Sequence, residues 1–404
     1  MTAHREKAGI RTIGMVAATG TLSALVSILF WGTPGTADVE EVWLPWLDSV
    51  KRFGLIAGYA DIADNYPPGT AALLTIAAKL MPGVDDRIVL KTLCAVAQFL
   101  SVVAFALNTK RIAWVLVYLA AVALSGSALG YLDILYAAPL LVALFALFDE
   151  RPIVSIAAFA AASLIKWQPL IMAPFLAIIW IEQARALPRR IVVIAGVVLL
   201  ACGTAVIGLF WPEIWLAFCR ALGGPPYWSG NALNLPWLAQ LVLGYPAQFL
   251  FVSDGPRLAA RILFCLVYLP ILILAATPFA KDTAQRLVLA LLGFAAYFLF
   301  APGVHENHLF VPMVASLVLA QRLPRFGWAA LALAIFANLN LVIFYGFDGT
   351  PPFLAGRPLA VLTAGLAAFA LCAFVWVAWH LLRSLYLDQV RHRKRPSSGK
   401  SFIG

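Results

Sequence analysis

Four short groups of polar and ionisable residues stand at the ends of long apolar runs in this sequence. They are Asp38-Val39-Glu40-Glu41, Asn65-Tyr66-Pro67-Pro68-Gly69, Lys166-Trp167-Gln168-Pro169 and Gly303-Val304-His305-Glu306-Asn307-His308. A carboxylate at the mouth of a cavity can act as a general base, because partial burial raises its pKa toward the working range. Lysine and histidine side chains nearby can hold an anionic headgroup, phosphate above all. The residue types therefore predict acid–base chemistry on a substrate that carries such a headgroup.

The elements that position these groups must lie in a membrane, because the composition excludes a water-soluble chain. Of the 404 residues, 63% are hydrophobic and 12% are charged, whereas a soluble domain needs about a quarter of its residues charged. Runs such as 112–130, 191–210 and 358–382 approach or exceed the roughly 20 apolar residues that cross a bilayer as a helix. The sequence predicts an all-α polytopic bundle of about 12–13 membrane helices, with further helices in its outward-facing loops.

The apolar runs predict one domain over residues 1–404 with about twelve crossings. We expect the crossings at 12–31, 88–107, 112–130, 134–148, 152–166, 168–183, 190–211, 257–276, 287–302, 309–320, 327–347 and 357–382. The first run lacks a small-residue cleavage site and is interpreted as a retained signal anchor. The run 67–80 is only about 14 residues long, so we expect it to be re-entrant and not to cross.

Basic residues gather in alternate short loops, and this pattern sets the predicted orientation. The net charge of +10 could indicate nucleic acid, but in a membrane protein Lys and Arg mark the cytoplasmic side. With the N-terminus inside, the basic cytoplasmic segments are 4–7, 110–111, 185–190, 281–286, 322–325 and 391–395. We therefore expect cytoplasmic termini, no nucleic-acid partner, and an extracytoplasmic site on a plasma or inner membrane.

Two long loops face outside in this topology. The loop 32–66 mixes acidic residues with Trp and Tyr, which suits helices that lie at the membrane interface. The loop 211–256 is rich in Trp, Pro, Gly and Asn. The cytoplasmic tail 383–404 is basic and is expected to contact anionic lipids. The outer loops are therefore where function should be sought.

Neither the cysteines nor the histidines predict a metal site. The five cysteines fall singly in or beside apolar runs, without the paired spacing of a disulfide framework or a zinc site. His305 and His308 have the spacing of i and i+3 but no clear third ligand. We therefore expect no metal and no cofactor.

The order of the four groups resembles the GT-C superfamily of integral membrane glycosyltransferases. The family has an Asp-x-Glu after the first span, a Tyr-Pro-Pro that opens the next helix, a Lys-x-x-Pro and a late Val-His-Glu. It includes protein O-mannosyltransferases, aminoarabinose lipid A transferases and the dolichol-pathway glucosyltransferases. Residues 304–306 look like the Val-His-Glu-Lys motif of that last group, with Asn307 in place of its lysine. Asn65 stands where its Asp-Tyr-Pro-Pro motif has the acid.

The resemblance implies transfer of a sugar from a polyprenyl-phosphate carrier to a hydroxyl of a glycan, lipid or protein acceptor, usually with inversion. Asp38 matches the family's catalytic carboxylate and would take the proton from the attacking hydroxyl. Lys166 and His305, with Arg220 as a third candidate, would neutralise the departing lipid phosphate. The other residues expected at substrate are Glu40, Glu41, Tyr66, Trp228, Asn231, Asn234, Glu306 and His308.

Each candidate also has a structural interpretation that needs no substrate. Asp38 could cap a helix, and Glu40 or Glu41 could pair with Lys51 or Arg52. The prolines at 67–68 suit the first turn of a helix, where a missing N–H loses nothing. Lys166 could simply reach the membrane interface, and the aromatic and amide groups of the loop 211–256 are also typical of an interfacial belt.

Two other classes of protein remain as alternatives to a glycosyltransferase. A secondary transporter would place its site near the membrane midplane, with broken helices and repeated halves, whereas ionisable groups here gather at helix ends. A glycan polymerase, a ligase or a translocase of lipid-linked sugars would use a similar cationic site on the outer face. The sequence favours the glycosyltransferase and leaves the sugar and the acceptor open.

Overall fold

The fold is a bundle of α-helices, seen in a computed structural model that describes residues 2–62, 65–224, 227–244, 253–280, 282–350 and 356–393. The two strands in this part of the chain are short, β1 (Ser229–Gly230) and β2 (Val304–His305), and they pair in parallel. The predicted all-α bundle is therefore confirmed.

The first half of the bundle runs from α1 to α9. Its helices are α1 (Thr2–Leu29), the π-helical turn η1 (Val39–Trp43), α2 (Leu44–Ile62), α3 (Pro68–Leu80), α4 (Asp86–Leu107), α5 (Ile112–Ala123), the π-helical turn η2 (Leu124–Ala128), α6 (Ile134–Phe148), α7 (Pro152–Ile165), the 3-10 turn η3 (Gln168–Met172), α8 (Ala173–Ala184) and α9 (Arg189–Leu209).

The second half runs from α10 to α16. Its helices are α10 (Glu213–Gly223), α11 (Leu235–Val242), α12 (Asp254–Ala276), α13 (Thr283–Phe300), the 3-10 turn η4 (Glu306–Leu309), α14 (Phe310–Arg322), the 3-10 turn η5 (Pro324–Phe326), α15 (Gly327–Tyr345) and α16 (Gly356–Arg393). The predicted tail 383–404 thus begins inside α16, and residues 394–404 lie outside the described part.

Six helices of the described chain are long and apolar enough to cross a membrane. They occupy Asp86–Leu107, Arg189–Leu209, Asp254–Ala276, Thr283–Phe300, Pro324–Tyr345 and Gly356–His380. None of the residues of α9, all of which are described, is buried in the protein. A helix that is apolar and unburied along its whole length fits contact with lipid. The count of about twelve crossings remains a prediction.

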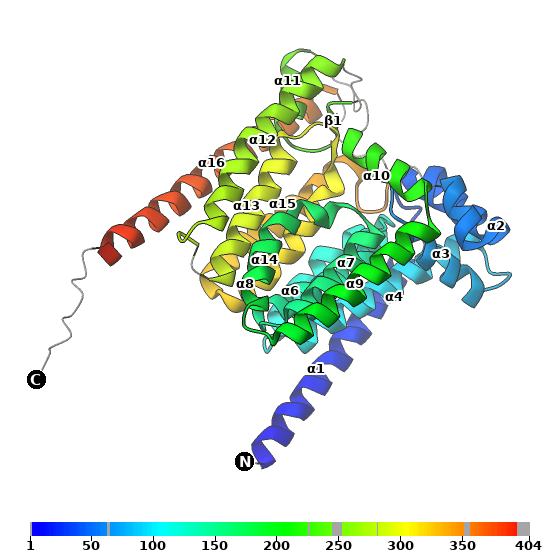
Figure 1. The fold of residues 1–404 in the computed structure, drawn as a ribbon. Helices are drawn as coiled ribbons and strands as arrows, with labels where there is room; N and C mark the ends of the chain where they lie inside the picture. The colour runs from blue at the N-terminus through cyan, green and yellow to red at the C-terminus, as the bar shows by residue number, and fades with distance from the viewer. Residues whose placement is uncertain are drawn as a thin grey trace, which may run out of the picture.

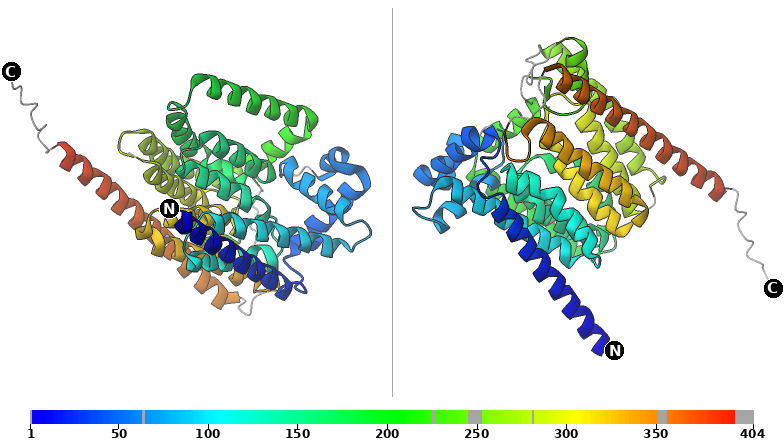
Figure 2. Two further views of the ribbon diagram at one scale, coloured as in Figure 1. Left: turned by 90° about the horizontal axis from the view of Figure 1, so that it is seen from below. Right: turned by 180° about the vertical axis from the view of Figure 1, so that it is seen from behind.

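The core lies where helices from both halves of the chain meet. Most residues of α6 and α14 are buried. Helix α6 packs on α4 and α7, while α14 packs on α13 and α15. In Figure 1 the N-terminal part of α1 and the C-terminal part of α16 both project beyond the rest of the bundle toward the lower left, and Figure 2 shows the same two helices from below and from behind. The polar side chains described below converge at the end of the bundle where α1, α7 and η2 finish.

The segment predicted to be re-entrant, 67–80, folds as helix α3. Thr70 in its first turn donates to the carbonyl oxygen of Ile165, at the end of α7, at 2.6 Å. Arg87, just beyond α3, donates to the carbonyl oxygen of Pro34, in the loop after α1, at 3.1 Å. Helix α3 has 13 residues, short for a crossing, and its re-entrant character stays a prediction.

Both predicted outer loops contain helices. The loop 32–66 includes η1 and α2, and the loop 211–256 includes α10, β1 and α11. Strand β1 pairs with β2, so the second loop is joined to the segment that carries His305. This pairing brings residues about 75 positions apart in the sequence side by side.

Candidate active site

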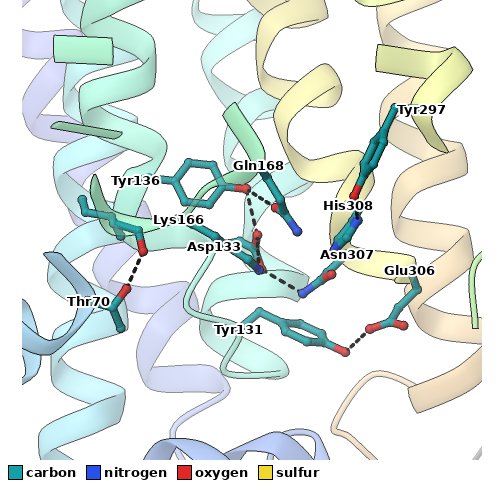
Figure 3. A network of polar contacts seen from close by, with 11 residues as sticks. Thr70, Tyr131, Asp133, Tyr136, Lys166, Gln168, Tyr297, Glu306, Asn307 and His308 are labelled. Atoms are coloured by element: carbon teal, nitrogen blue, oxygen red, sulfur yellow. Dashed lines mark hydrogen bonds and ion pairs between the residues drawn. The ribbon is translucent and has the colours of Figure 1, made fainter. Parts of the chain in front are cut away.

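A buried ion pair between Asp133 and Lys166 forms the centre of the site (Figure 3). The ammonium of Lys166 lies 2.9 Å and 3.0 Å from the two carboxylate oxygens of Asp133. The hydroxyl of Tyr136 donates to the same carboxylate at 2.8 Å, and the amide of Asn307 donates to it at 3.0 Å. These donors stabilise Asp133 as an anion inside the protein.

The charge of Lys166 is retained despite burial. Burial by itself would lower the pKa of this lysine, but the adjacent Asp133 carboxylate outweighs it and holds the pKa above its ordinary value. Lys166 is thus a permanent cation whose charge is already compensated. The interpretation of Lys166 as a side chain that merely reaches the membrane interface is wrong, because only 7% of the residue is exposed.

Asp38 lies beside this pair and makes no capping bond. It occupies the position before η1, yet its side chain accepts no hydrogen bond from that helix. The residue is half-buried. Burial raises the pKa of the Asp38 carboxyl, the charge of Lys166 lowers it, and the charges of Asp133 and Glu41 raise it further. The capping interpretation therefore does not explain Asp38, whereas the raised pKa suits a general base.

The other two acids of the first loop are exposed. Glu40 pairs with Arg87, not with Lys51 or Arg52 as the sequence suggested. Sequence reasoning missed this partner because Arg87 belongs to α4, and the whole of α3 separates it from Glu40 along the chain. Glu41 is exposed and interacts electrostatically with Asp38. A role for either glutamate at substrate stays a prediction.

Tyr66 connects an aromatic cluster to the ion pair. Its ring lies 5.5 Å from that of Trp43 and 5.1 Å from that of Trp46, both edge to face. The ammonium of Lys166 lies 5.2 Å from the centre of the Tyr66 ring. Burial raises the pKa of Tyr66 to about 12, so its hydroxyl is a neutral donor. The following Pro68 stands in the first turn of α3, as expected.

His305 and His308 are neutral bases in this structure. Burial lowers the pKa of His305 to about 4, and Lys166 lowers it further in the same direction. The hydroxyl of Tyr227 forms a hydrogen bond with Nε2 of His305. His308 stacks on Tyr297, whose hydroxyl lies 2.9 Å from its Nδ1, and burial also lowers the pKa of His308. A contact of His305 with a phosphate stays a prediction, and the lowered pKa favours a hydrogen bond over a charge pair for that contact.

Glu306 faces a tyrosine and not a cation. Its Oε1 accepts a hydrogen bond of 2.5 Å from the hydroxyl of Tyr131, in the loop that also carries Asp133. Burial raises the pKa of Glu306 to about 8. Asp38, Lys166 and Glu306 lie within electrostatic range of one another, although they come from three separate parts of the chain. Folding therefore brings the first, third and fourth groups of the sequence together.

The amides of the second loop have clear structural roles. Asn234 caps α11 by accepting a bond of 2.9 Å from the backbone N–H of Trp237, and its amide donates to the carbonyl of Phe298 at 3.1 Å. The amide of Asn231 donates to the hydroxyl of Tyr345 at 3.1 Å. These bonds hold the second loop on the bundle, so contact with substrate stays a prediction for both asparagines.

Trp228 lines an apolar groove, while Arg220 lies elsewhere. The groove has a volume of about 200 Å³ and opens between α11, α12 and the end of α13. The backbone oxygen of Trp228 accepts a hydrogen bond of 2.9 Å from the backbone N–H of Gly303, and this bond connects the groove to the His305 segment. Arg220 is exposed in the last turn of α10. Besides Trp228, the groove is lined chiefly by Pro236, Ala239, Ala259, Leu263 and Phe300.

A buried lysine positions the two loops that supply the carboxylates. Lys91 of α4 donates to Oγ1 of Thr33 at 2.8 Å and to the carbonyl oxygen of Ser127 at 3.1 Å. Thr33 belongs to the loop that leads to Asp38, and Ser127 belongs to η2, which leads to Asp133. One ammonium thus ties together the two segments that approach the ion pair.

Sequence reasoning missed Asp133 and Lys91 as members of the site. Asp133 was recognisable as an acid between two apolar runs, an expensive place for a charge, but its partner was not. Among the described residues, no group of three or more His, Cys, Asp and Glu side chains is arranged to hold a metal ion. Comparison of the sequence with protein-family models and with curated proteins finds no match.

Proposed function

We propose that this protein is a membrane glycosyltransferase that moves a sugar from a polyprenyl-phosphate carrier to an acceptor hydroxyl, with Asp38 as general base. The observation that carries the proposal is the position of Asp38: a half-buried carboxylate, free of capping bonds, next to a buried lysine. The resemblance of the four sequence groups to GT-C enzymes supplies the reaction class.

In the proposed reaction, the acceptor oxygen attacks the anomeric carbon while Asp38 takes its proton. The bond from that carbon to the phosphate oxygen breaks, and the lipid phosphate leaves with the electron pair. The ammonium of Lys166 is hydrogen-bonded to Asp133 and to Tyr66, so a phosphate oxygen would have to take the place of Tyr66 as its third acceptor. The neutral His305 and Tyr66 would add hydrogen bonds to the phosphate and not charge.

The groove lined by Trp228 supports a lipid-linked donor. Its walls are apolar, and it opens between α11 and α12, the latter almost unburied along its span. An isoprenoid chain placed there would be in contact with the bilayer, and its phosphate end would point toward the His305 segment, to which Trp228 is hydrogen-bonded through Gly303. The apolar tail and the charged headgroup would thus occupy adjoining sites.

The test is transfer of labelled sugar by the purified full-length protein from a panel of polyprenyl-phosphate sugars. Asp38→Asn and Asp38→Ala are expected to lower the rate by about 10²–10⁴-fold, the usual loss when a general base is removed. Asp48→Asn is the matched control, because Asp48 lies in the same loop and pairs with Arg52 on the surface at 2.8 Å. Its rate should equal that of the wild type.

Two results would refute the proposal. Equal transfer by the wild type and both Asp38 variants would remove the catalytic role of that carboxylate. Movement of solute across sealed vesicles, without any transfer from the panel, would favour the secondary transporter. Joining of several lipid-linked sugars into a chain would instead identify a glycan polymerase, with the same donor but a different acceptor.

A further inference from the structure

A small cavity lies next to the candidate active site and shares Glu306 and Asn307 with it. It is formed where η2, η4, α14 and α15 meet, and its volume of about 10 Å³ is that of a single water-sized sphere. Four polar side chains line it, from Ser125, Glu306, Asn307 and Asn338, and the rest of its wall is apolar. The cavity therefore has room for one small occupant with polar chemistry.

Each of these four side chains has one buried oxygen with no hydrogen-bond partner among the described residues. The atoms are Oγ of Ser125, Oε2 of Glu306, Oδ1 of Asn307 and Oδ1 of Asn338. Buried polar atoms of native proteins are normally paired, so four unpaired oxygens around one space point to a ligand. Ser125 could donate to any of the others, yet its hydroxyl reaches none of them. The four oxygens therefore do not satisfy one another.

The orientation of these oxygens is fixed by bonds on their other side. The amide nitrogen of Asn338 donates to the carbonyl oxygens of Ala121 at 3.1 Å and Ala334 at 2.9 Å. The amide nitrogen of Asn307 donates to Asp133, and Oε1 of Glu306 is held by Tyr131. Neither amide can turn without losing these bonds, so acceptor oxygens must face the cavity.

The chemistry of the oxygens selects a hard cation of single charge. A carboxylate, two amide oxygens and a hydroxyl form an all-oxygen set, which suits hard metal ions. Glu306 is the only acidic side chain on the cavity wall formed by these residues; burial raises its pKa to about 8, so a bound cation takes the place of its proton, while the ammonium of Lys166 is already bonded to Asp133. One cation of single charge balances one carboxylate, whereas a divalent ion would leave a buried excess charge.

We propose that this cavity binds one Na⁺ ion, held by the four side-chain oxygens. The π-helical turn η2 contributes to the site, since its wider turn places Ser125 on the cavity wall; such turns are frequent at functional sites. The ion acts on the candidate active site through two of its ligands: Glu306 holds Tyr131, and Asn307 holds Asp133. Bound sodium thereby stabilises the loop that carries Tyr131 and Asp133, next to Asp38.

The test measures binding without any sugar substrate, so its outcome is independent of the proposed glycosyl transfer. The full-length protein, purified in an uncharged detergent, is unfolded thermally while NaCl replaces choline chloride at constant ionic strength. A ligand that binds only the folded state raises the midpoint in a saturable way. We expect such a rise with Na⁺ and not with K⁺ at the same concentrations.

Three variants separate the site from general salt effects. Glu306→Gln keeps the shape of the side chain but removes its charge, and we expect the Na⁺ response to disappear. Ser125→Ala removes a hydroxyl that has no hydrogen-bond partner in the described part of the chain, so the sodium-free midpoint should stay the same while the Na⁺ concentration for half-saturation rises about tenfold. Glu150→Gln, at an exposed position, should respond to Na⁺ as the wild type does.

Three results would overturn the proposal. An equal response of the wild type to Na⁺, K⁺ and choline would mean that a proton or a water molecule satisfies the oxygens instead. Saturation by Mg²⁺ or Ca²⁺ in place of Na⁺ would contradict the charge argument. If the Na⁺ concentration for half-saturation is unchanged in Ser125→Ala, the ion binds elsewhere. This variant keeps the test decisive if Glu306→Gln does not fold.

Discussion

Replacement of Asp133 by Asn tests the buried ion pair most directly. The substitution removes the carboxylate that binds Lys166, while Lys166 itself remains 7% exposed and charged inside the protein. Removal of one partner of a buried pair usually costs about 3–5 kcal/mol, because the other charge is left without compensation. No allowance for solvent screening is needed at this site, since Asp133 is fully buried.

A double-mutant cycle isolates the interaction from the effect of each substitution. Lys166→Met leaves Asp133 as an unpaired buried anion and should lower the free energy of unfolding by a similar amount. Asp133→Asn combined with Lys166→Met has no buried charge at this position, so the loss should be smaller than the sum of the single losses. We expect a coupling energy on the order of 2–3 kcal/mol.

The assay is reversible unfolding of the full-length protein in mixed micelles, followed by circular dichroism. Asp48→Asn is the matched control, because Asp48 forms a surface pair with Arg52 and exposed pairs contribute less than about 1 kcal/mol. Additivity of the two single variants within about 0.5 kcal/mol would refute the reasoning. It would mean that Asp133 and Lys166 do not form a desolvated pair.

Two further predictions concern proton transfer and packing. The rate of sugar transfer should rise with pH through a pKa above the ordinary Asp value of about 3.9. The reason is that burial raises the pKa of Asp38 and only its ionised form can accept a proton. A flat rate–pH profile from about pH 4 to pH 8 would contradict this. Gly69→Ala should lower the free energy of unfolding by about 1–3 kcal/mol, because a Cβ would lie 2.3 Å from the carbonyl oxygen of Leu164. Gly208→Ala is the control: it lies in a helix with open space around it and should leave thermal stability unchanged or raise it. An equal loss of stability in both variants would show that the contact of α3 with α7 is not close.

The arrangement of the site explains how a charged centre is maintained in an apolar bundle. Asp133 and Lys166 neutralise each other, so their combined charge does not have to be solvated by water. Asp38, at the edge of the pair, keeps partial exposure and the ability to change protonation. One acid that is fully paired and one that is free of capping bonds suit general base catalysis.

The sequence by itself determined the helical, membrane-like character of the chain. Hydrophobicity along a segment is a local property, so the long apolar runs were sufficient to predict helices close to those observed, among them α4, α9, α12 and α15. The prolines at 67–68 likewise predicted a helix start, because the preference of proline for the first turn depends on the backbone alone. The short length of α3 is also a local property, and that it does not cross a membrane stays a prediction.

Only the tertiary structure decided which charges meet and which are lost. Lys166 pairs with an acid 33 positions away, and Asn307 reaches that same acid across 174 positions. Burial lowers the pKa of His305 to about 4, which no inspection of its neighbours in the sequence could indicate. The cavity behind Glu306 likewise exists only where four separate segments pack together. Protonation, pairing and cavity shape depend on long-range packing, because they are set by the surroundings of a side chain and not by its residue type.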